Sequence, residues 1–325
     1  MWSKILLDPA ELHLAAVLRC GQSFRWKQHS EGIWSICMQN RVLFVKQDSQ
    51  NLFYRTEGSG NSSFSDRELV DDYFNLKICL KDLYEDWVSK DAKHFQKVHW
   101  GVRILRQDPW ETLCAFICSS NNNIKRISKM VESLCTEFGP LVAKIDDHEY
   151  YDFPEPAVLA RNPSKTEQRL RDLGFGYRAK YIAQTAKMMT EKPNDFLQKL
   201  RSANAEDCNL ALMEFTGVGP KVADCVSLMS LDKHSIVPID THMYQIASRN
   251  YKMKVVQGNK GYKEVQEKLA GIWGDYAGWA HSVLFAGDLP DLHTLKRESE
   301  TEQQSSSKKI KSELSDANVK AEIKV

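Results

Sequence analysis

The sequence lacks the features that mark several classes of protein. Its 325 residues carry a formal net charge of only +1, so no overall excess of positive charge indicates a polyanionic partner. No apolar run approaches the roughly 18 residues that a membrane-spanning helix needs. The first residues have neither the apolar core of a signal peptide nor the Arg-rich pattern of a transit peptide. We therefore expect a soluble intracellular protein with no membrane partner.

Cysteine is present, but not in the spacing that metal or redox sites use. None of the eight cysteines forms a Cys-x-x-Cys pair, which argues against a zinc ribbon and against a thioredoxin-like redox site. Cys114 and Cys118 share one face of a predicted helix among apolar neighbours. We expect them to be buried, reduced thiols.

Aromatic residues are absent from the C-terminal end, where Ser, Glu and Lys dominate. Such a segment cannot bury enough apolar area to offset the entropy lost on ordering, so residues 293–325 are predicted to be a disordered charged tail. The Lys-Lys-Ile-Lys run at 308–311 fits either a nuclear-localisation signal or a solvated group of charges, and the sequence leaves both open.

The rest of the chain divides by pattern into a strand-rich part and a helix-rich part. Short aromatic and β-branched runs at 34–37, 42–45 and 52–54, separated by turn residues, predict antiparallel strands. Capping residues such as Asp108 and Asn123 precede apolar positions at helical spacing further along. The sequence therefore predicts an α+β fold with an antiparallel sheet domain at 1–104, an all-helical domain at 105–292 and the tail at 293–325.

Residues 212–224 have the pattern of two helices joined by a Gly-x-Gly turn. Gly217 and Gly219 permit positive φ angles and a close approach by another backbone, and Pro220 suits the first turn of a helix. Unpaired amides at that helix start favour an anion such as a phosphate. We interpret the segment as a helix-hairpin-helix that holds one DNA strand without reading its sequence. A plain αα-hairpin with a glycine turn is the alternative.

Lys221 and Asp240 are the candidate catalytic pair. The helix dipole and partial burial are expected to lower the pKa of Lys221, which would make its amine a nucleophile, although a phosphate-contacting lysine is an alternative. Asp240 follows by 19 positions (240 − 221), one helix and a return, which can bring it beside the amine. Its carboxylate would stabilise positive charge developing on a sugar, unless it serves only as a helix N-cap.

Five further motifs occur in one order along the chain. They are Gly-Gln-Ser-Phe-Arg-Trp at 21–26, Cys-Ser-Ser-Asn-Asn-Asn-Ile at 118–124, Gly-Tyr-Arg at 176–178, Lys-Val-Ala-Asp-Cys at 221–225 and Gly-Trp-Ala at 278–280. Together with the Val-Pro-Ile-Asp at 237–240, they resemble the eukaryotic 8-oxoguanine DNA glycosylases of the helix-hairpin-helix superfamily over residues 1 to about 290. The resemblance implies a TATA-binding-protein-like first domain.

This resemblance implies a bifunctional DNA glycosylase and abasic-site lyase of base excision repair. The enzyme would act as a monomer in the nucleus on double-stranded DNA carrying 8-oxoguanine, or a ring-opened purine, opposite cytosine. Lys221 would attack C1′ with help from Asp240, forming a Schiff base that nicks the strand by β-elimination. The carbonyl of Gly21 would accept N7–H of the lesion, where undamaged guanine has a lone pair. The remaining damaged-base contacts would be Cys225, Phe285, His281, Phe116 and Met229.

The resemblance also implies contacts away from the damaged base. Asn121, Arg126 and Arg178 would read the orphaned cytosine, while Tyr177 wedges into the stack and His242 contacts a phosphate. Gly217 and Gly219 would face the DNA backbone. A structural monovalent cation is implied at the carbonyls of Met213, Phe215 and Val218. No iron–sulfur cluster is expected, because the chain has no cysteine after Cys225.

His281 departs from the family pattern, which has Gln at this position of the base pocket. A neutral histidine offers one acceptor, and a protonated one offers none. We expect weaker base recognition or a compensating contact, with excision falling as acid protonates His281 and with this loss absent in His281→Gln.

Two other functions fit part of this pattern. A glycosylase for another lesion, such as an alkylated purine, would use Asp240 but would not need Lys221 or Gly21. A non-catalytic DNA-binding module would need the hairpin alone. The joint presence of Lys221, Asp240, Cys225 and Phe285 favours the 8-oxoguanine glycosylase.

Overall fold

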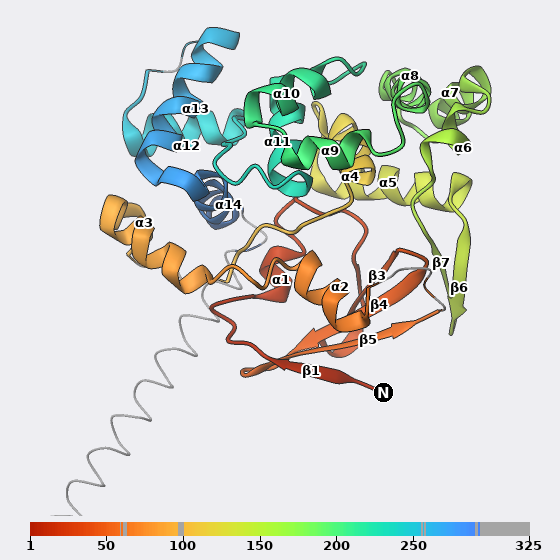
Figure 1. Ribbon diagram of the computed structural model, residues 1–325, viewed down its shortest axis with the longest axis horizontal. Coiled ribbons are helices and arrows are strands. Elements are labelled where there is room, and N and C mark those ends of the chain that lie inside the picture. Colours follow the sequence, from red (N-terminus) through yellow and green to blue (C-terminus); the bar gives the residue numbers. More distant parts are fainter. Residues whose placement is uncertain are drawn as a thin grey trace, which may run out of the picture.

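The computed structural model describes residues 1–58, 60, 64–96, 101–254, 256, 258–289 and 292. An N-terminal sheet lies on one side of a larger group of helices, as Figure 1 shows with the sheet in red and orange. Within the described residues, no helix is long and apolar enough to cross a bilayer. The predicted tail at 293–325, with its Lys-Lys-Ile-Lys run, lies outside the described residues.

The sheet is antiparallel, with strand order β1-β5-β4-β3-β2. The central strands form the predicted meander, in which Ile36 pairs with Leu43 and both side chains are buried. Gln39 and Asn40 both have positive φ angles, as a two-residue hairpin turn requires. The strands are β1 (Ser3–Leu6), β2 (Lys27–Gln28), β3 (Trp34–Met38), β4 (Arg41–Gln47) and β5 (Asn51–Glu57).

Helix starts lie where the capping residues predict them. Ser65 and Glu68 form a reciprocal capping box at α2 (Asp66–Tyr73). Asp108 accepts the amide of Glu111 at the start of α4 (Pro109–Ser119), and Asn123 caps α5 (Ile124–Phe138). α4 is the central helix of the core: it packs on α5, α8 and α11, and its side chains are buried from Pro109 to Cys118 except that of Glu111.

The other helices follow in chain order around this core (Figure 1). Short 3₁₀ turns occur at η1 (Ser30–Gly32) and η2 (Gly274–Tyr276). The helices are α1 (Leu14–Val17), α3 (Leu80–Phe95), α6 (Pro156–Ala160), α7 (Pro163–Asp172), α8 (Arg178–Thr190), α9 (Phe196–Ser202), α10 (Ala205–Met213), α11 (Pro220–Ser230), α12 (Thr241–Tyr251), α13 (Asn259–Trp273) and α14 (Ala277–Asp288).

The helical part also contains a two-stranded hairpin, which the sequence pattern did not predict. Its strands are β6 (Leu141–Ile145) and β7 (His148–Tyr151). Tyr150 packs in a buried cluster with Cys37 and Phe44, and its hydroxyl lies 3.0 Å from that of Ser35. The expectation of helices alone after residue 104 is therefore wrong for this segment, which extends the packing of the N-terminal sheet.

α3 precedes the predicted domain boundary in sequence but packs with the helices that follow it. Its Trp87 and Phe95 belong to the same buried cluster as Trp273 of α13. The ring of Phe95 lies 6.3 Å from that of Trp273. The division between residues 104 and 105 stays a prediction, because packing does not follow one cut through the chain.

Candidate active site

One pocket brings together every residue that the sequence analysis assigned to catalysis or to the damaged base. It lies between α11, α14, the C-terminal half of α4, the segment before α12 and the loop after α1. Its lining residues are Cys20, Gly21, Gln22, Phe116, Lys221, Cys225, Met229, Pro238, Asp240, His281, Ser282 and Phe285. The chain segments that form it are up to 265 positions apart (285 − 20), so only the tertiary fold brings them together.

The hairpin before α11 uses its two glycines differently. Gly217 has a φ of +82°, and an added Cβ there would collide with the ring of Tyr181. Gly219 has an ordinary φ of −102° and is exposed, with no atom within 4 Å of where a Cβ would lie. Positive φ is therefore needed only at Gly217. As N-cap of α11, Gly219 has no side chain to occupy the first amides of the helix, which leaves them open to an anion.

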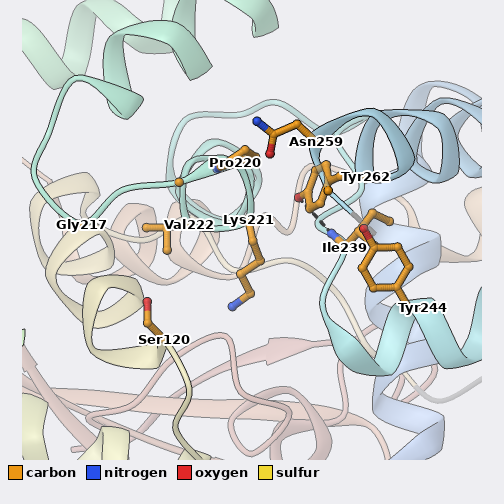
Figure 2. Close-up of a pocket in the computed structure, with 11 residues that line it drawn as sticks. Ser120, Gly217, Pro220, Lys221, Val222, Ile239, Tyr244, Asn259 and Tyr262 are labelled. Atoms are coloured by element: carbon orange, nitrogen blue, oxygen red, sulfur yellow. Dashed lines mark hydrogen bonds between the residues drawn. The ribbon is translucent and has the colours of Figure 1, made fainter. Parts of the chain in front are cut away.

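Lys221 is the second residue of α11 and points toward the C-terminal end of α4, as Figure 2 shows in the open groove beside the hairpin. Its Nζ donates a hydrogen bond to Oγ of Ser119 at 3.3 Å and lies 5.0 Å from the centre of the Phe116 ring. Cys225 follows one helical turn later and lines the same pocket. The amine thus lies between a hydroxyl and an aromatic face at the mouth of the pocket.

Asp240 caps α12, as its position predicted, by accepting the amide of Met243 on Oδ1 at 2.9 Å. Within the described residues its Oδ2 has no hydrogen bond, so capping leaves one carboxylate oxygen available to the pocket. The charges of both Asp240 and Lys221 influence the pKa values of His281 and Cys225. The two charges therefore lie close to the same pair of side chains. The capping role and the catalytic role are therefore compatible.

His281 is neutral in this pocket. Burial lowers its pKa to about 4, an effect that Asp240 opposes and Lys221 reinforces. Its ring stacks on Phe285 with centroids 5.9 Å apart. Its buried Nδ1 makes no hydrogen bond of normal geometry, although the Gly278 carbonyl one turn earlier slightly favours the charged ring. A loss of excision through His281 protonation is therefore expected only near pH 4, not near the usual histidine value.

Cys225 is likewise uncharged near neutrality. Burial raises the pKa of its thiol to about 11, although Lys221 lowers it. A neutral thiol and the ring of Phe285 are apolar, polarisable surfaces that suit the two faces of a purine. A purine in this pocket would thus contact apolar surfaces on its two faces and one neutral imidazole. Lys221 and Asp240 are the charged residues that line the pocket.

The residues predicted to read the opposite base gather outside this pocket, where α4 ends and α8 begins. Tyr177 donates its hydroxyl to the carbonyl of Ser120 at 3.0 Å, and Arg178 donates to the carbonyls of Ser120 and Asn121. Arg126 donates to the carbonyl of Gly174 at 3.1 Å. His242 is exposed and lies edge-on to Phe285, 5.7 Å away.

Gln22 lies in the motif at 21–26, but the sequence alone gives it no role. The Gln22 side chain accepts the amide of Leu105 and donates to the carbonyl of Arg103, both at 2.9 Å. Its own carbonyl accepts from Gln107 at 2.8 Å. Gln22 thus fixes the loop that carries Gly21, whose φ is +83°. Ser119, Cys20, Pro238 and Ser282 were also missed, because apolar or hydroxyl residues carry no catalytic pattern of their own.

Two family models cover most of the chain. The model of the 8-oxoguanine DNA glycosylase N-terminal domain matches residues 4–113, and that of the HhH-GPD superfamily of base excision DNA repair proteins matches residues 114–275. The N-glycosylase/DNA lyase of Saccharomyces cerevisiae is 39% identical over 89% of this chain and 86% of the yeast protein. The chain belongs to the 8-oxoguanine DNA glycosylase family.

Other members agree with this membership. The Arabidopsis thaliana N-glycosylase/DNA lyase OGG1 is 37% identical over 90% of this chain and 82% of the plant protein. The Clostridium acetobutylicum 8-oxoguanine glycosylase/lyase, in complex with double-stranded DNA containing cytosine opposite 8-oxoG, superposes with a TM-score of 0.74 at 28% identity. That match covers 85% of this chain and 91% of the bacterial one. Membership in this family of glycosylase/lyases confirms the α+β fold class, the DNA-repair function and the enzyme class predicted from sequence.

Proposed function

We propose that this protein excises 8-oxoguanine from double-stranded DNA and then cleaves the strand at the abasic site, with Lys221 as nucleophile. The observation that carries the proposal is the single pocket that holds Lys221, Asp240, Cys225 and Phe285 beside the carbonyl-bearing loop at Gly21. A DNA-binding module would need only the hairpin and would not need an amine and a carboxylate facing one apolar pocket.

In the first step the amine of Lys221 attacks C1′ of the flipped nucleotide. The bond from C1′ to the base breaks, and its electron pair leaves with the base, which takes up the proton that the attacking nitrogen loses. Asp240 stabilises the positive charge that develops on the sugar. Opening of the sugar then gives a Schiff base to Lys221. Loss of a C2′ proton from this Schiff base expels the 3′ phosphate and nicks the strand.

Lesion recognition is assigned to the Gly21 carbonyl and to His281. The Gly21 carbonyl accepts the N7–H that 8-oxoguanine has and guanine lacks. His281 supplies one acceptor for the N1 or N2 edge of the base, because it is neutral above about pH 4. One acceptor is fewer than a Gln carbonyl provides with its two lone pairs, so this edge is read less strictly than in the family pattern.

Cytosine opposite the lesion is the proposed partner base. Arg126 and Arg178 would donate to its O2 and N3 acceptors while Tyr177 fills the gap left by the flipped base. Both arginines donate to carbonyls of the protein itself through Nη2, which holds each side chain in place and leaves other guanidinium N–H groups for the base. Action as a monomer and location in the nucleus are proposed with this function, on the family resemblance alone.

The hairpin carbonyls of Met213, Phe215 and Val218 are the proposed site of a structural monovalent cation. Neutral carbonyl oxygens suit a singly charged hard cation, and these three lie between the last residue of α10 and the turn that leads into α11. The Phe215 carbonyl also accepts the amide of Val218 at 3.2 Å, so it would use its second lone pair. A test is the stability of the protein in potassium against a large organic cation, with a higher Tm expected in potassium.

Borohydride trapping on a duplex with 8-oxoguanine opposite cytosine tests the proposed function. The reagent reduces a Schiff base to a stable adduct, so wild-type protein should become covalently joined to the DNA. Lys221→Gln should form no adduct. Lys268→Gln, an exposed lysine on α13 paired with Glu264, is the matched control and should form as much adduct as wild type.

Three other outcomes of this experiment would each contradict one part of the proposal. Base release without an adduct would contradict the lyase mechanism and leave a hydrolytic glycosylase that relies on Asp240. Neither release nor adduct would contradict the proposed lesion. An adduct that persists in Lys221→Gln would contradict the assignment of the nucleophile.

A further inference from the structure

The helix that carries Lys221 also carries a buried carboxylate that the mechanism does not use. Asp224 is 1% exposed and sits on α11, three residues after Lys221. Its Oδ2 accepts the hydroxyl of Tyr262 at 2.5 Å and the side-chain amide of Gln266 at 2.6 Å, and its Oδ1 accepts from Asn209. A buried carboxylate with three donors is a fixed anchor, because breaking any of these bonds leaves a charge poorly solvated.

Tyr262 and Gln266, the two donors on α13, also bind the segment that ends in Asp240. The amide of Ile239 donates to the Tyr262 hydroxyl at 3.1 Å, which Figure 2 marks with a dashed line. The Gln266 amide also donates to the carbonyl of Val237 at 3.0 Å. The main chain on the N-terminal side of Asp240 is therefore fastened at two points to side chains that Asp224 orients.

The direction of the hydrogen bonds through Tyr262 is fixed by its surroundings. Burial and the neighbouring Asp224 raise the pKa of the Tyr262 hydroxyl, so it stays protonated. Its one proton goes to Asp224, and a lone pair accepts the amide of Ile239. Two hydrogen bonds therefore connect α11 to the residue before Asp240: Tyr262 donates to Asp224 and accepts from Ile239. No other orientation of the Tyr262 hydroxyl proton keeps both bonds.

We propose that Tyr262 and Gln266 are positioning residues that set the distance between the Lys221 amine and the Asp240 carboxylate. They connect the backbone before Asp240 to Asp224 by hydrogen bonds, and Asp224 lies on the same helix as Lys221. This inference rests on the proposed function, in which the two groups act on one sugar. A displacement of about 1 Å between such groups costs up to about 100-fold in rate.

The test is a double-mutant cycle on the single-turnover rate of base release. Tyr262→Phe removes one hydroxyl, so the Ile239 amide and Asp224 each lose a partner while the ring remains. In the wild-type background it should slow base release by about 10- to 100-fold and leave the Kd for lesion DNA within about twofold. In the Asp240→Asn background it should slow release by less than about threefold, because the carboxylate it positions is gone.

Tyr244→Phe is the matched control. Tyr244 lies on α12 on the other side of Ile239 in Figure 2, and in the described part of the chain its hydroxyl makes no hydrogen bond. This exchange should leave the rate unchanged. If Tyr262→Phe does not fold, Gln266→Met carries the same cycle, since it cuts the bond to the Val237 carbonyl.

An equal slowing by Tyr262→Phe in both backgrounds would overturn the inference, because a general loss of structure does not depend on Asp240. An unchanged rate in the wild-type background would overturn it as well. Failure of the proposed function has a different signature: Asp240→Asn alone would then release the base as fast as wild type, whatever Tyr262 does.

Discussion

The damaged-base pocket and the opposite-base surface are built in contrasting ways. In the pocket, Cys225, Phe116 and His281 are buried on long helices, and the Gln22 side chain pins the loop beside them. On the opposite-base surface, Tyr177, Arg178 and Arg126 lie where helices begin. They donate to carbonyls of their own chain, as Arg126 does to Gly174. One region is enclosed within the fold, whereas the other is held by a few hydrogen bonds to backbone carbonyls and keeps further N–H donors for a base.

This contrast indicates where each kind of specificity arises. A pre-formed pocket discriminates by fixed dipoles and shape, at no reorganisation cost when the base enters. A surface open to water gains less from each contact, because each bond to cytosine replaces one to water and the side chains lose rotational freedom on binding. We therefore expect substitutions in the pocket to change the rate of excision strongly, and substitutions on the opposite-base surface to change the preference for cytosine more mildly.

The largest effect is expected for Asp240→Asn. Loss of the negative charge should slow base release by about 10²- to 10⁴-fold, because the positive charge on the sugar loses its stabilising partner. The free energy of unfolding should barely change, since Asn caps a helix about as well as Asp. Single-turnover kinetics and urea unfolding measure the two quantities. Asp108→Asn, the same exchange at the N-cap of α4, should leave the rate unaltered.

The pH dependence of stability should show whether the pocket keeps His281 neutral by excluding water. In the unfolded chain a histidine binds a proton near pH 6.5, but in the native protein His281 does so only near pH 4. The unfolded state therefore binds more protons in this interval, so stability falls as the pH falls through it. Between pH 7 and pH 4.5 the wild type should lose about 2 kcal/mol more than His281→Gln.

Urea unfolding at the two pH values measures this difference, with His242→Gln as the exposed-histidine control. The control should follow the wild type. Equal losses in wild type and His281→Gln would show that His281 is not held neutral, and the pocket would then be wetter than its packing indicates.

A smaller effect is expected for Arg126→Ala on the opposite-base surface. The preference for cytosine over the other three bases should fall by roughly tenfold, within the 1–3 kcal/mol that one good base contact supplies. Stability should change by less than about 0.5 kcal/mol, because Arg126 is exposed. Excision rates on four duplexes that differ only in the opposite base measure this preference. A rate loss shared by all four would assign Arg126 to general DNA binding.

The smallest effect is expected at the hairpin, in a matched pair of exchanges. Gly219→Ala should leave the free protein as stable as wild type, since its φ is ordinary and the space is open, yet weaken DNA binding a few-fold by keeping the strand at a distance. Gly217→Ala should instead destabilise the protein by about 1 kcal/mol or more, because of its positive φ. Thermal unfolding and a DNA-binding titration separate the two. Tight DNA binding by Gly219→Ala would mean that the strand does not approach this hairpin.

Much of this arrangement follows from local patterns in the sequence. The caps at Asp108, Asn123 and Asp240, the meander of strands and the hairpin before Lys221 each depend on a few neighbouring residues, and the structure has all of them. The gathering of the pocket residues was predictable only through family resemblance, because their segments are far apart in the chain.

What could not be predicted depends on contacts between distant residues. The bond between Asp224 and Gln266 joins positions 42 apart, and no local pattern marks either residue as a partner of the other. The role of Gln22 depends in the same way on backbone groups at 103 and 105. The β6–β7 hairpin was missed because its strands are short and largely exposed, so they lack the apolar alternation that identifies buried strands.

The most direct test of the central claim is to locate the covalent link itself. After borohydride trapping on 8-oxoguanine DNA, the protein is digested and the peptide that carries the sugar remnant is identified by mass spectrometry. The pocket predicts a single modified site, Lys221. A remnant on any other lysine would contradict the assignment of the nucleophile and, with it, the catalytic role of the pocket that Lys221 shares with Asp240.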